Sequence, residues 1–128
     1  MNQFRLRTVL ALVIGLSGLG GAAFAHGGSV PEHGGVLKLV ADTSVELVRK
    51  PTGVEVWVEE EGEEIPSATM TGKLVIVDGG ATKEVELQPA TDNMLEAKGL
   101  TIGSGATVTV TVAAKVGHDK TTAVFTVN

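Results

Sequence analysis

The sequence predicts an all-β domain, an immunoglobulin-like antiparallel β-sandwich of seven or eight strands, with a small closed barrel as the alternative. From Leu37 onward, apolar residues alternate with polar ones, which is the period of a strand that buries one face. Turn-forming residues recur between these runs, as expected for short strands joined by tight connections in about 100 residues. After the leader, no segment of a dozen residues carries the apolar stripe of a helix.

The strands are predicted in order from the alternating runs. Val54, Val56 and Val58 alternate with acidic and aromatic residues. The run 107–112 alternates threonine with valine, and both have high strand propensity. The predicted strands are 36–41, 43–50, 53–60, 69–78, 82–88, 93–98, 105–114 and 120–127.

The chain divides into three parts. Residues 1–25 are predicted to be a secretory signal peptide: Arg5 and Arg7 precede an apolar stretch, and Ala23-Phe24-Ala25 fits the cleavage site. An uncleaved anchor is the alternative. Residues 26–35 form a Gly/His-rich N-terminal tail, and 36–128 form the β-sandwich domain. We therefore expect a periplasmic protein, secreted across the inner membrane of a Gram-negative bacterium, with no membrane insertion after signal cleavage.

Composition removes several classes of function. The 128 residues include no cysteine, which excludes disulfides and thiolate metal sites. Tyrosine is absent and there is one tryptophan, so a stacking surface for nucleic acid is not expected. Removing Arg5 and Arg7 with the leader takes the net charge from −5 to −7, which disfavours nucleic-acid partners further. Nucleophile-elbow, zinc-protease and phosphate-loop motifs are also missing, so no enzyme is predicted.

The tail suggests a metal site. Cleavage after Ala25 makes His26 the first residue, and its α-amine and ring Nδ1 can close a chelate on one ion. His33 follows seven residues later in a second His-Gly-Gly triplet, within a glycine-rich segment free to fold onto the same ion. Nitrogen ligands suit copper, nickel and zinc, and affinity peaks at copper. The competing interpretation is a tail whose histidines have no role.

Two more residues could join this site. His118 and Asp119 lie in a predicted turn between the last two strands. His118 could supply a third nitrogen, and Asp119, or Glu32 of the tail, could be an oxygen ligand or an orienting partner. An ordinary polar turn is the alternative, because aspartate is favoured in turns for its backbone hydrogen bonds.

Three other features are weaker candidates. The acidic run 59–64 lacks the spacing of a calcium loop and fits a solvated hairpin tip. Met70 and Met94 could bind Cu(I) but are more typical of core packing. Trp57 falls on the polar side of its strand, where it could contact a partner or cover the second face of the sheet.

The tail and the strands after it carry a resemblance. The segment 32–37, Glu-His-Gly-Gly-Val-Leu, leads into Val45-Glu46-Leu47-Val48 and the run 53–58, and the segment 88–97 follows. This pattern is similar to small periplasmic proteins of heavy-metal and copper handling, and to the β-domain of heavy-metal efflux adaptor subunits. The resemblance implies a metal-resistance role. In architecture the chain also resembles the CopC-type copper carriers, although their later Asp-x-His pair is replaced here by His118-Asp119.

The predicted function is binding of a divalent transition metal, with copper favoured and zinc or nickel as alternatives, for carriage, buffering or efflux support. The predicted ligands are His26 and His33, with His118 and Asp119 as further candidates. A metal-efflux or metal-transport component is the expected partner. The competing hypothesis is a secreted interaction module without a metal role, and a copper oxidase is a remote third.

Overall fold

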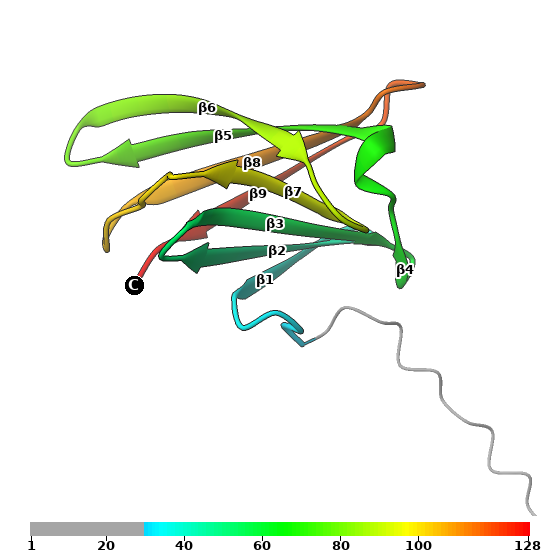
Figure 1. Ribbon diagram of the computed structural model, residues 1–128, viewed down its shortest axis with the longest axis horizontal. Helices are drawn as coiled ribbons and strands as arrows, with labels where there is room; N and C mark the ends of the chain where they lie inside the picture. Colours follow the sequence, from blue (N-terminus) through cyan, green and yellow to red (C-terminus); the bar gives the residue numbers. More distant parts are fainter. Residues whose placement is uncertain (1–29) are drawn as a thin grey trace, which may run out of the picture.

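A computed structural model describes residues 30–128 (Figure 1). The predicted signal peptide and His26 lie outside this part of the chain. Its elements are strands β1 (Val36–Val40), β2 (Thr43–Lys50), β3 (Gly53–Glu60), β4 (Glu63–Glu64), β5 (Met70–Asp78), β6 (Ala81–Pro89), β7 (Met94–Lys98), β8 (Thr107–Ala114) and β9 (Lys120–Thr126), with one short 3₁₀ helix, η1 (Ser67–Thr69). Across residues 30–128, no helix is long and apolar enough to cross a membrane.

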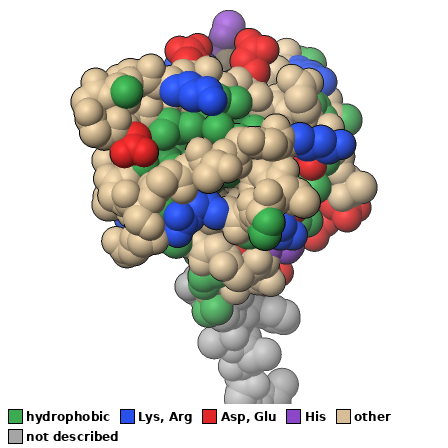
Figure 2. Space-filling model, turned by 60° about the vertical axis from the view of Figure 1, so that its left-hand side comes forward, with side chains coloured by type: hydrophobic (Ala, Val, Ile, Leu, Met, Phe, Trp, Pro, Cys, Tyr) green, Lys and Arg blue, Asp and Glu red, His purple; other side chains and the backbone are tan. Residues whose placement is uncertain are grey.

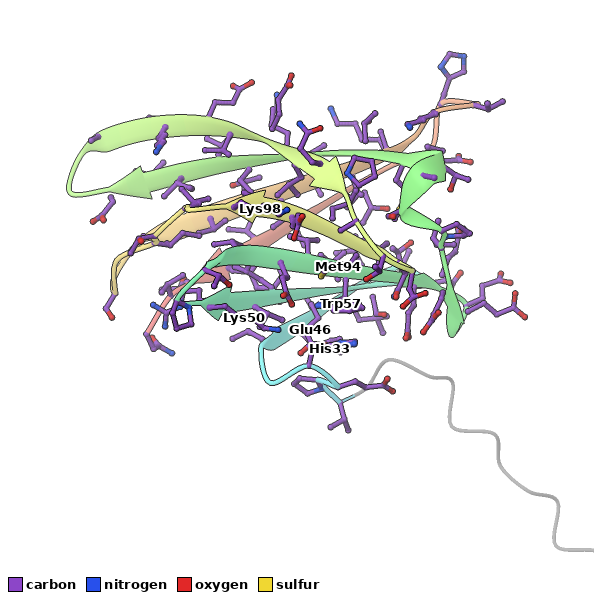
Figure 3. The ribbon with its side chains drawn as sticks, in the orientation of Figure 1. His33, Glu46, Lys50, Trp57, Met94 and Lys98 are labelled. Atoms are coloured by element: carbon purple, nitrogen blue, oxygen red, sulfur yellow. The ribbon has the colours of Figure 1, made fainter. Side chains whose placement is uncertain are left out.

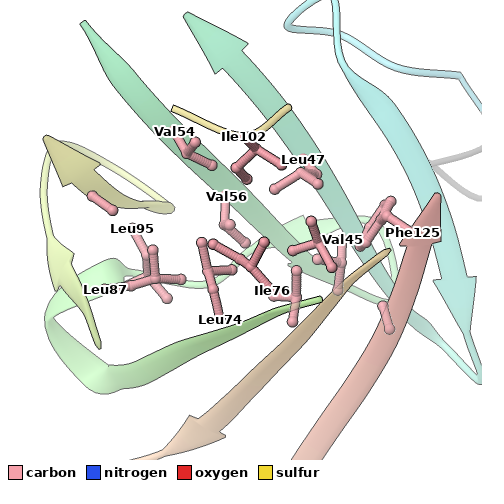
Figure 4. Close-up of a cluster of buried hydrophobic side chains, with 14 of the residues drawn as sticks. Val45, Leu47, Val54, Val56, Leu74, Ile76, Leu87, Leu95, Ile102 and Phe125 are labelled. Carbon is pink, nitrogen blue, oxygen red and sulfur yellow. The ribbon is translucent and has the colours of Figure 1, made fainter. Parts of the chain in front are cut away.

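All strand pairs are antiparallel and follow one path, β1-β2-β3-β7-β6-β5-β8-β9, with β4 attached to β3. Strands β5, β6 and β7 are consecutive neighbours, and β8 returns to pair with β5. This order is a Greek key. At the ends of the path, β9 lies next to β1 (Figure 4). The sheet is therefore nearly closed into a barrel.

The structure confirms the predicted all-β antiparallel fold. The eight predicted strands all form, and their bounds shift by at most two residues. The near closure follows the barrel that the sequence left as an alternative. The short β4 was not predicted: the acidic run forms a hairpin in which Glu60 pairs with Glu63 across Glu61-Gly62. The turn residues Glu61 and Gly62 have φ of 53° and 80°, as a two-residue hairpin requires.

The inward-facing residues of the strands form one hydrophobic core (Figure 4). In β3 these are the predicted alternating valines 54, 56 and 58, each at most 2% exposed. In β8 the valines 108, 110 and 112 are buried in the same way. Phe125, Leu74 and Leu95 are the largest apolar side chains that are fully buried. The opposite faces of the strands are left for solvent or for covering segments.

Candidate metal-ligand site around His33

Strand β2 is buried on both faces, unlike an ordinary outer strand. Val45 and Leu47 face the core, whereas Ser44, Glu46 and Val48 lie on the outer face and are nevertheless buried. The segment 30–35 folds back over this outer face before β1 begins, as Figure 3 shows. Part of the glycine-rich tail is therefore held against the sheet.

Glu46 holds this segment in place. The residue is 2% exposed. Its carboxylate accepts hydrogen bonds from the backbone N–H groups of Glu32 (3.1 Å), His33 (2.9 Å) and Gly35 (2.9 Å). It also pairs with the Nδ1 of His33 at 2.8 Å. Four donors thus converge on one carboxylate, which is what burial of an acidic group requires.

These contacts keep Glu46 ionised. Burial by itself raises the pKa of its carboxyl. The hydrogen bonds from Gly35, from the His33 side chain and from the backbone of His33 and Glu32 outweigh burial, and the pKa lies below its ordinary value of 4.5. At neutral pH the carboxylate is an acceptor and carries no proton of its own.

The ionised Glu46 selects one form of the His33 ring. Because a carboxylate only accepts, the Nδ1 beside it carries the hydrogen. In the neutral ring the lone pair is then on Nε2. The Nε2 atom makes no hydrogen bond with residues 30–128, and the His33 side chain is 30% exposed. Nε2 is therefore the ring nitrogen available to a ligand.

Trp57 fixes the plane of the His33 ring. It lies directly across from Glu46 in the β2–β3 register. The two rings stack with centroids 3.6 Å apart and an interplanar angle of 5°. The Trp57 Nε1 donates to Glu55 at 3.1 Å, and Glu55 pairs with Lys50 at 2.9 Å. Trp57 thus covers the second face of the sheet and stacks on the His33 ring, and Figure 3 shows Trp57 just above His33 in the view.

The close approach of the segment depends on Gly35. A Cβ atom there would lie 2.3 Å from the Leu47 carbonyl oxygen, which is closer than Cβ atoms in proteins approach other atoms. Gly34 has φ of +80°, but a Cβ there meets nothing within 4 Å. Gly35 is therefore needed for close packing on β2, whereas Gly34 is favoured only by its positive φ.

Replacing Gly35 with alanine should detach the segment. We expect the free energy of unfolding to fall by about 2–3 kcal/mol, as in overpacked sites. The matched Gly34→Ala should cost about 1 kcal/mol, from backbone strain alone. Urea unfolding of both variants measures the difference. Equal losses would contradict the packing of Gly35 on β2.

The other predicted ligands lie elsewhere. His118 and Asp119 are exposed in the β8–β9 turn. Figure 1 shows this turn at the upper end of the view and the segment before β1 at the lower end, and Figure 2 shows histidine side chains at the top and bottom. The structure does not bring His118 together with His33. His26 lies outside the described part of the chain.

The methionines and the acidic hairpin also have clear positions. Met70 is 4% exposed in the core, as its packing interpretation predicts. Met94 is half-buried on the outer face, where it pairs with Trp57 in the register on the side away from Glu46. Within residues 30–128, no group of three or more His, Cys, Asp or Glu side chains is placed to hold a metal ion. These residues contribute one oriented nitrogen and its supporting carboxylate.

Glu46 is the functional residue that sequence reasoning missed. The sequence feature that could have revealed it is the single acidic residue in the apolar run Val45-Glu46-Leu47-Val48. Glu46 is the one charged residue among the buried positions of β2. Its partners lie 11 to 14 residues earlier, across a hairpin, which no local pattern reveals.

The chain matches no family model. No curated protein and no solved structure matches it either.

Proposed function

We propose that the protein binds a divalent transition metal in the periplasm, with copper favoured over zinc and nickel, for carriage, buffering or efflux support. The observation that carries the proposal is the Glu46–His33 pair. A histidine that ligates a metal usually donates its other ring N–H to a carboxylate or carbonyl, which fixes the tautomer and increases the basicity of the ligating nitrogen. His33 has this partner already in place.

The proposed remaining ligands come from the mature N-terminus. Val30 lines the same small hollow as His33 and Trp57. His26 precedes Val30 by four residues, which span at most about 14 Å. Over this span, the α-amine and Nδ1 of His26 could bind the same ion as the Nε2 of His33. Gly27 and Gly28 would allow the chain to turn. Three nitrogens would then hold one ion.

A site of this kind suits exchange more than permanent storage. The His33 side chain is 30% exposed on the outer face of the sheet, and the other two proposed ligand atoms would belong to His26, the first residue of the cleaved chain. The net charge of −7 expected for the cleaved chain attracts cations. Transfer to a metal-efflux or metal-transport component is the corresponding partner role. The immunoglobulin-like class of the fold stays part of this proposal, and the Greek key supports it, since most β-sandwiches contain one.

The test is a Cu²⁺ titration of the periplasmically processed chain, with its N-terminus checked by mass. His33→Ala should weaken binding by about tenfold or more, because it removes one oriented nitrogen. His118→Ala is the matched control, since it removes an exposed imidazole at the other end of the molecule, and it should change little. Equal effects of the two variants would contradict the proposal.

A second candidate function is a secreted interaction module in which the histidines have no role. His33 and Trp57 stack on one another. Loss of either ring would therefore disturb the same surface, whether that surface binds a metal or a protein partner. His26→Ala separates the two functions: it should reduce metal binding and leave a protein partner bound.

A further inference from the structure

An apolar hollow of about 80 Å³ opens at the end of the sheet that carries the β8–β9 turn. Glu60 lines it from β3 and Asp119 lines it from that turn, so it lies between the β3–β4 hairpin and the β8–β9 turn. Figure 1 shows both of these at the same end of the molecule. The apolar lining is Val58, Ile65, Met70, Val112 and Ala113. We call the hairpin 59–64, this end hollow and the turn 115–120 together the end face.

One side of the end hollow is acidic. Glu60, Glu61, Glu63 and Glu64 are all exposed on the β3–β4 hairpin. The Glu61 N–H donates to the Asp42 carbonyl at 2.8 Å, which places another exposed acidic residue next to the hairpin. The ion pairs among residues 30–128 involve none of these residues. The charge on this side is therefore left for an outside partner.

The other side of the end hollow is cationic. The turn 115–120 carries Lys115, Lys120 and His118 against the single Asp119, and all four are exposed. Neither lysine takes part in an ion pair within residues 30–128. The Lys115 N–H donates to a carbonyl oxygen of η1 at 2.9 Å, which fixes the base of the turn. The end face thus carries the two signs of charge on opposite sides of an apolar centre.

Val116 projects from the tip of the turn. It is 90% exposed, which is more than any other large apolar side chain of residues 30–128. A single exposed valine is common on protein surfaces. Here it lies two residues beyond Ala114, which lines the end hollow. A surface that covered both would remove their apolar area from water together.

A second copy of the chain is complementary to this end face. A two-fold axis through the end hollow would set the acidic hairpin of each copy against the cationic turn of the other, because an isologous interface repeats every contact twice. Val116 of each copy would then lie against the hairpin side of the other copy's hollow, where Ile65 is half-buried. A partner with charge of one sign would match only half of the face.

We infer that two copies of the chain associate through the end face as a two-fold dimer. The end of so small a sheet offers a small interface, and the net charge of −7 expected for the cleaved chain opposes close approach. A weak dimer follows, with a dissociation constant of about 10–500 µM. This inference does not depend on the proposed metal function, because no residue of the end face is among the ligands proposed for the metal.

Sedimentation equilibrium of the periplasmically processed chain measures the association, from about 10 µM to about 1 mM. EDTA is present throughout, so that no metal bridges exposed histidines. The wild type should pass from monomer to dimer over this range. Val116→Ser should weaken the dimer by about tenfold, because the side chain is buried twice. Val77→Ser, the matched control, removes a valine that is 42% exposed at the other end of β5, and it should weaken the dimer less than about twofold.

Exchange of charges tests the pairing of the two sides. One variant carries Glu61→Lys, Glu63→Lys and Glu64→Lys, and the other carries Lys115→Glu and Lys120→Glu. Each variant alone should be monomeric, because both sides of its end face then carry the same sign. An equal mixture of the two should dimerise, because each side of one variant meets the opposite charge on the other.

Several outcomes would overturn the inference: a wild type that stays monomeric, equal weakening by the two valine variants, or a mixture with no more dimer than its components. Binding of the monomer to phosphatidylglycerol vesicles in place of dimerisation would do so too. Amide shifts in NMR spectra of the wild type at rising concentration locate the contact without any substitution. They should fall within 59–65 and 112–121, and shifts elsewhere would contradict the end-face dimer even if a variant failed to fold.

Discussion

Replacing Glu46 with alanine should lower the free energy of unfolding by about 2–4 kcal/mol. The change removes the acceptor of three backbone N–H groups and the His33 Nδ1, and buried donors left without a partner carry a desolvation cost of about 1–3 kcal/mol. The segment 30–35 should then leave the sheet. Urea unfolding measures the loss, and hydrogen exchange at Gly35 reports the release.

Two variants bracket this result. Glu46→Gln keeps an acceptor oxygen and nearly the same shape, so it should lose only part of the stability. Glu59→Ala removes another acidic side chain from the outer face of the neighbouring strand β3, where it accepts a hydrogen bond from the Ser44 hydroxyl at 3.5 Å. This change should cost less than about 1 kcal/mol. A Glu46→Ala variant as stable as Glu59→Ala would contradict the role of Glu46 as the holder of the segment.

The lowered pKa of Glu46 makes the same contact pH-dependent. A carboxyl whose pKa is depressed by folding adds stability above its ordinary value of 4.5 and loses it as the pH falls through the folded value. The metal-free wild type should therefore lose more stability between pH 6 and pH 3 than Glu46→Gln does. Denaturant unfolding across this range gives the difference. Parallel curves for the two proteins would show that Glu46 does not titrate as its contacts require.

Copper affinity should fall by about a hundredfold when the mature chain begins one residue earlier. An added methionine before His26 moves the α-amine away from the His26 ring and breaks the proposed chelate. Linked donors on one ion gain about two orders of magnitude or more over separate ones. The measurement is competition for Cu²⁺ against a chelator of known affinity, with processed and methionine-extended chains side by side.

The stability of the fold serves as the control for this comparison. The extension lies outside the segment that Glu46 holds, so the unfolding midpoint without metal should not change. His26→Ala keeps the α-amine and removes the ring, and it should show a comparable loss of affinity. If the extended chain bound copper as tightly as the processed one, the N-terminal chelate would be wrong.

The strands were predictable because their signal is local. Alternating valines in β3 and alternating threonine and valine in β8 fix both the element and the face that each residue presents. The closure of the sheet was not predictable in this way. It depends on the pairing of β3 with β7 and of β5 with β8, between segments far apart in the chain, and each of these strands has the same pattern in a sandwich as in a barrel.

The candidate site was predictable only in part. His33 was singled out by its glycine-rich surroundings, and the described structure gives it an orienting carboxylate and a stacking ring. Neither partner was visible as such, because Glu46 reaches His33 across the β1–β2 hairpin and Trp57 reaches it across two strands. The role of Trp57 was left undecided for the same reason. The alternation in its strand placed Trp57 on the outer face, but the segment that covers it lies more than 20 residues earlier in the chain.

The central claim is that Glu46 holds the hydrogen of His33 on Nδ1 and leaves the lone pair on Nε2. Long-range ¹H–¹⁵N NMR spectra of the His33 ring test it directly at neutral pH, before and after addition of Zn²⁺ as a diamagnetic substitute for copper. For the neutral form of the ring, the account predicts a hydrogen on Nδ1 and none on Nε2 without metal, and a shift of the Nε2 signal when zinc binds. A neutral ring with its hydrogen on Nε2, or a zinc-dependent shift confined to Nδ1, would contradict it.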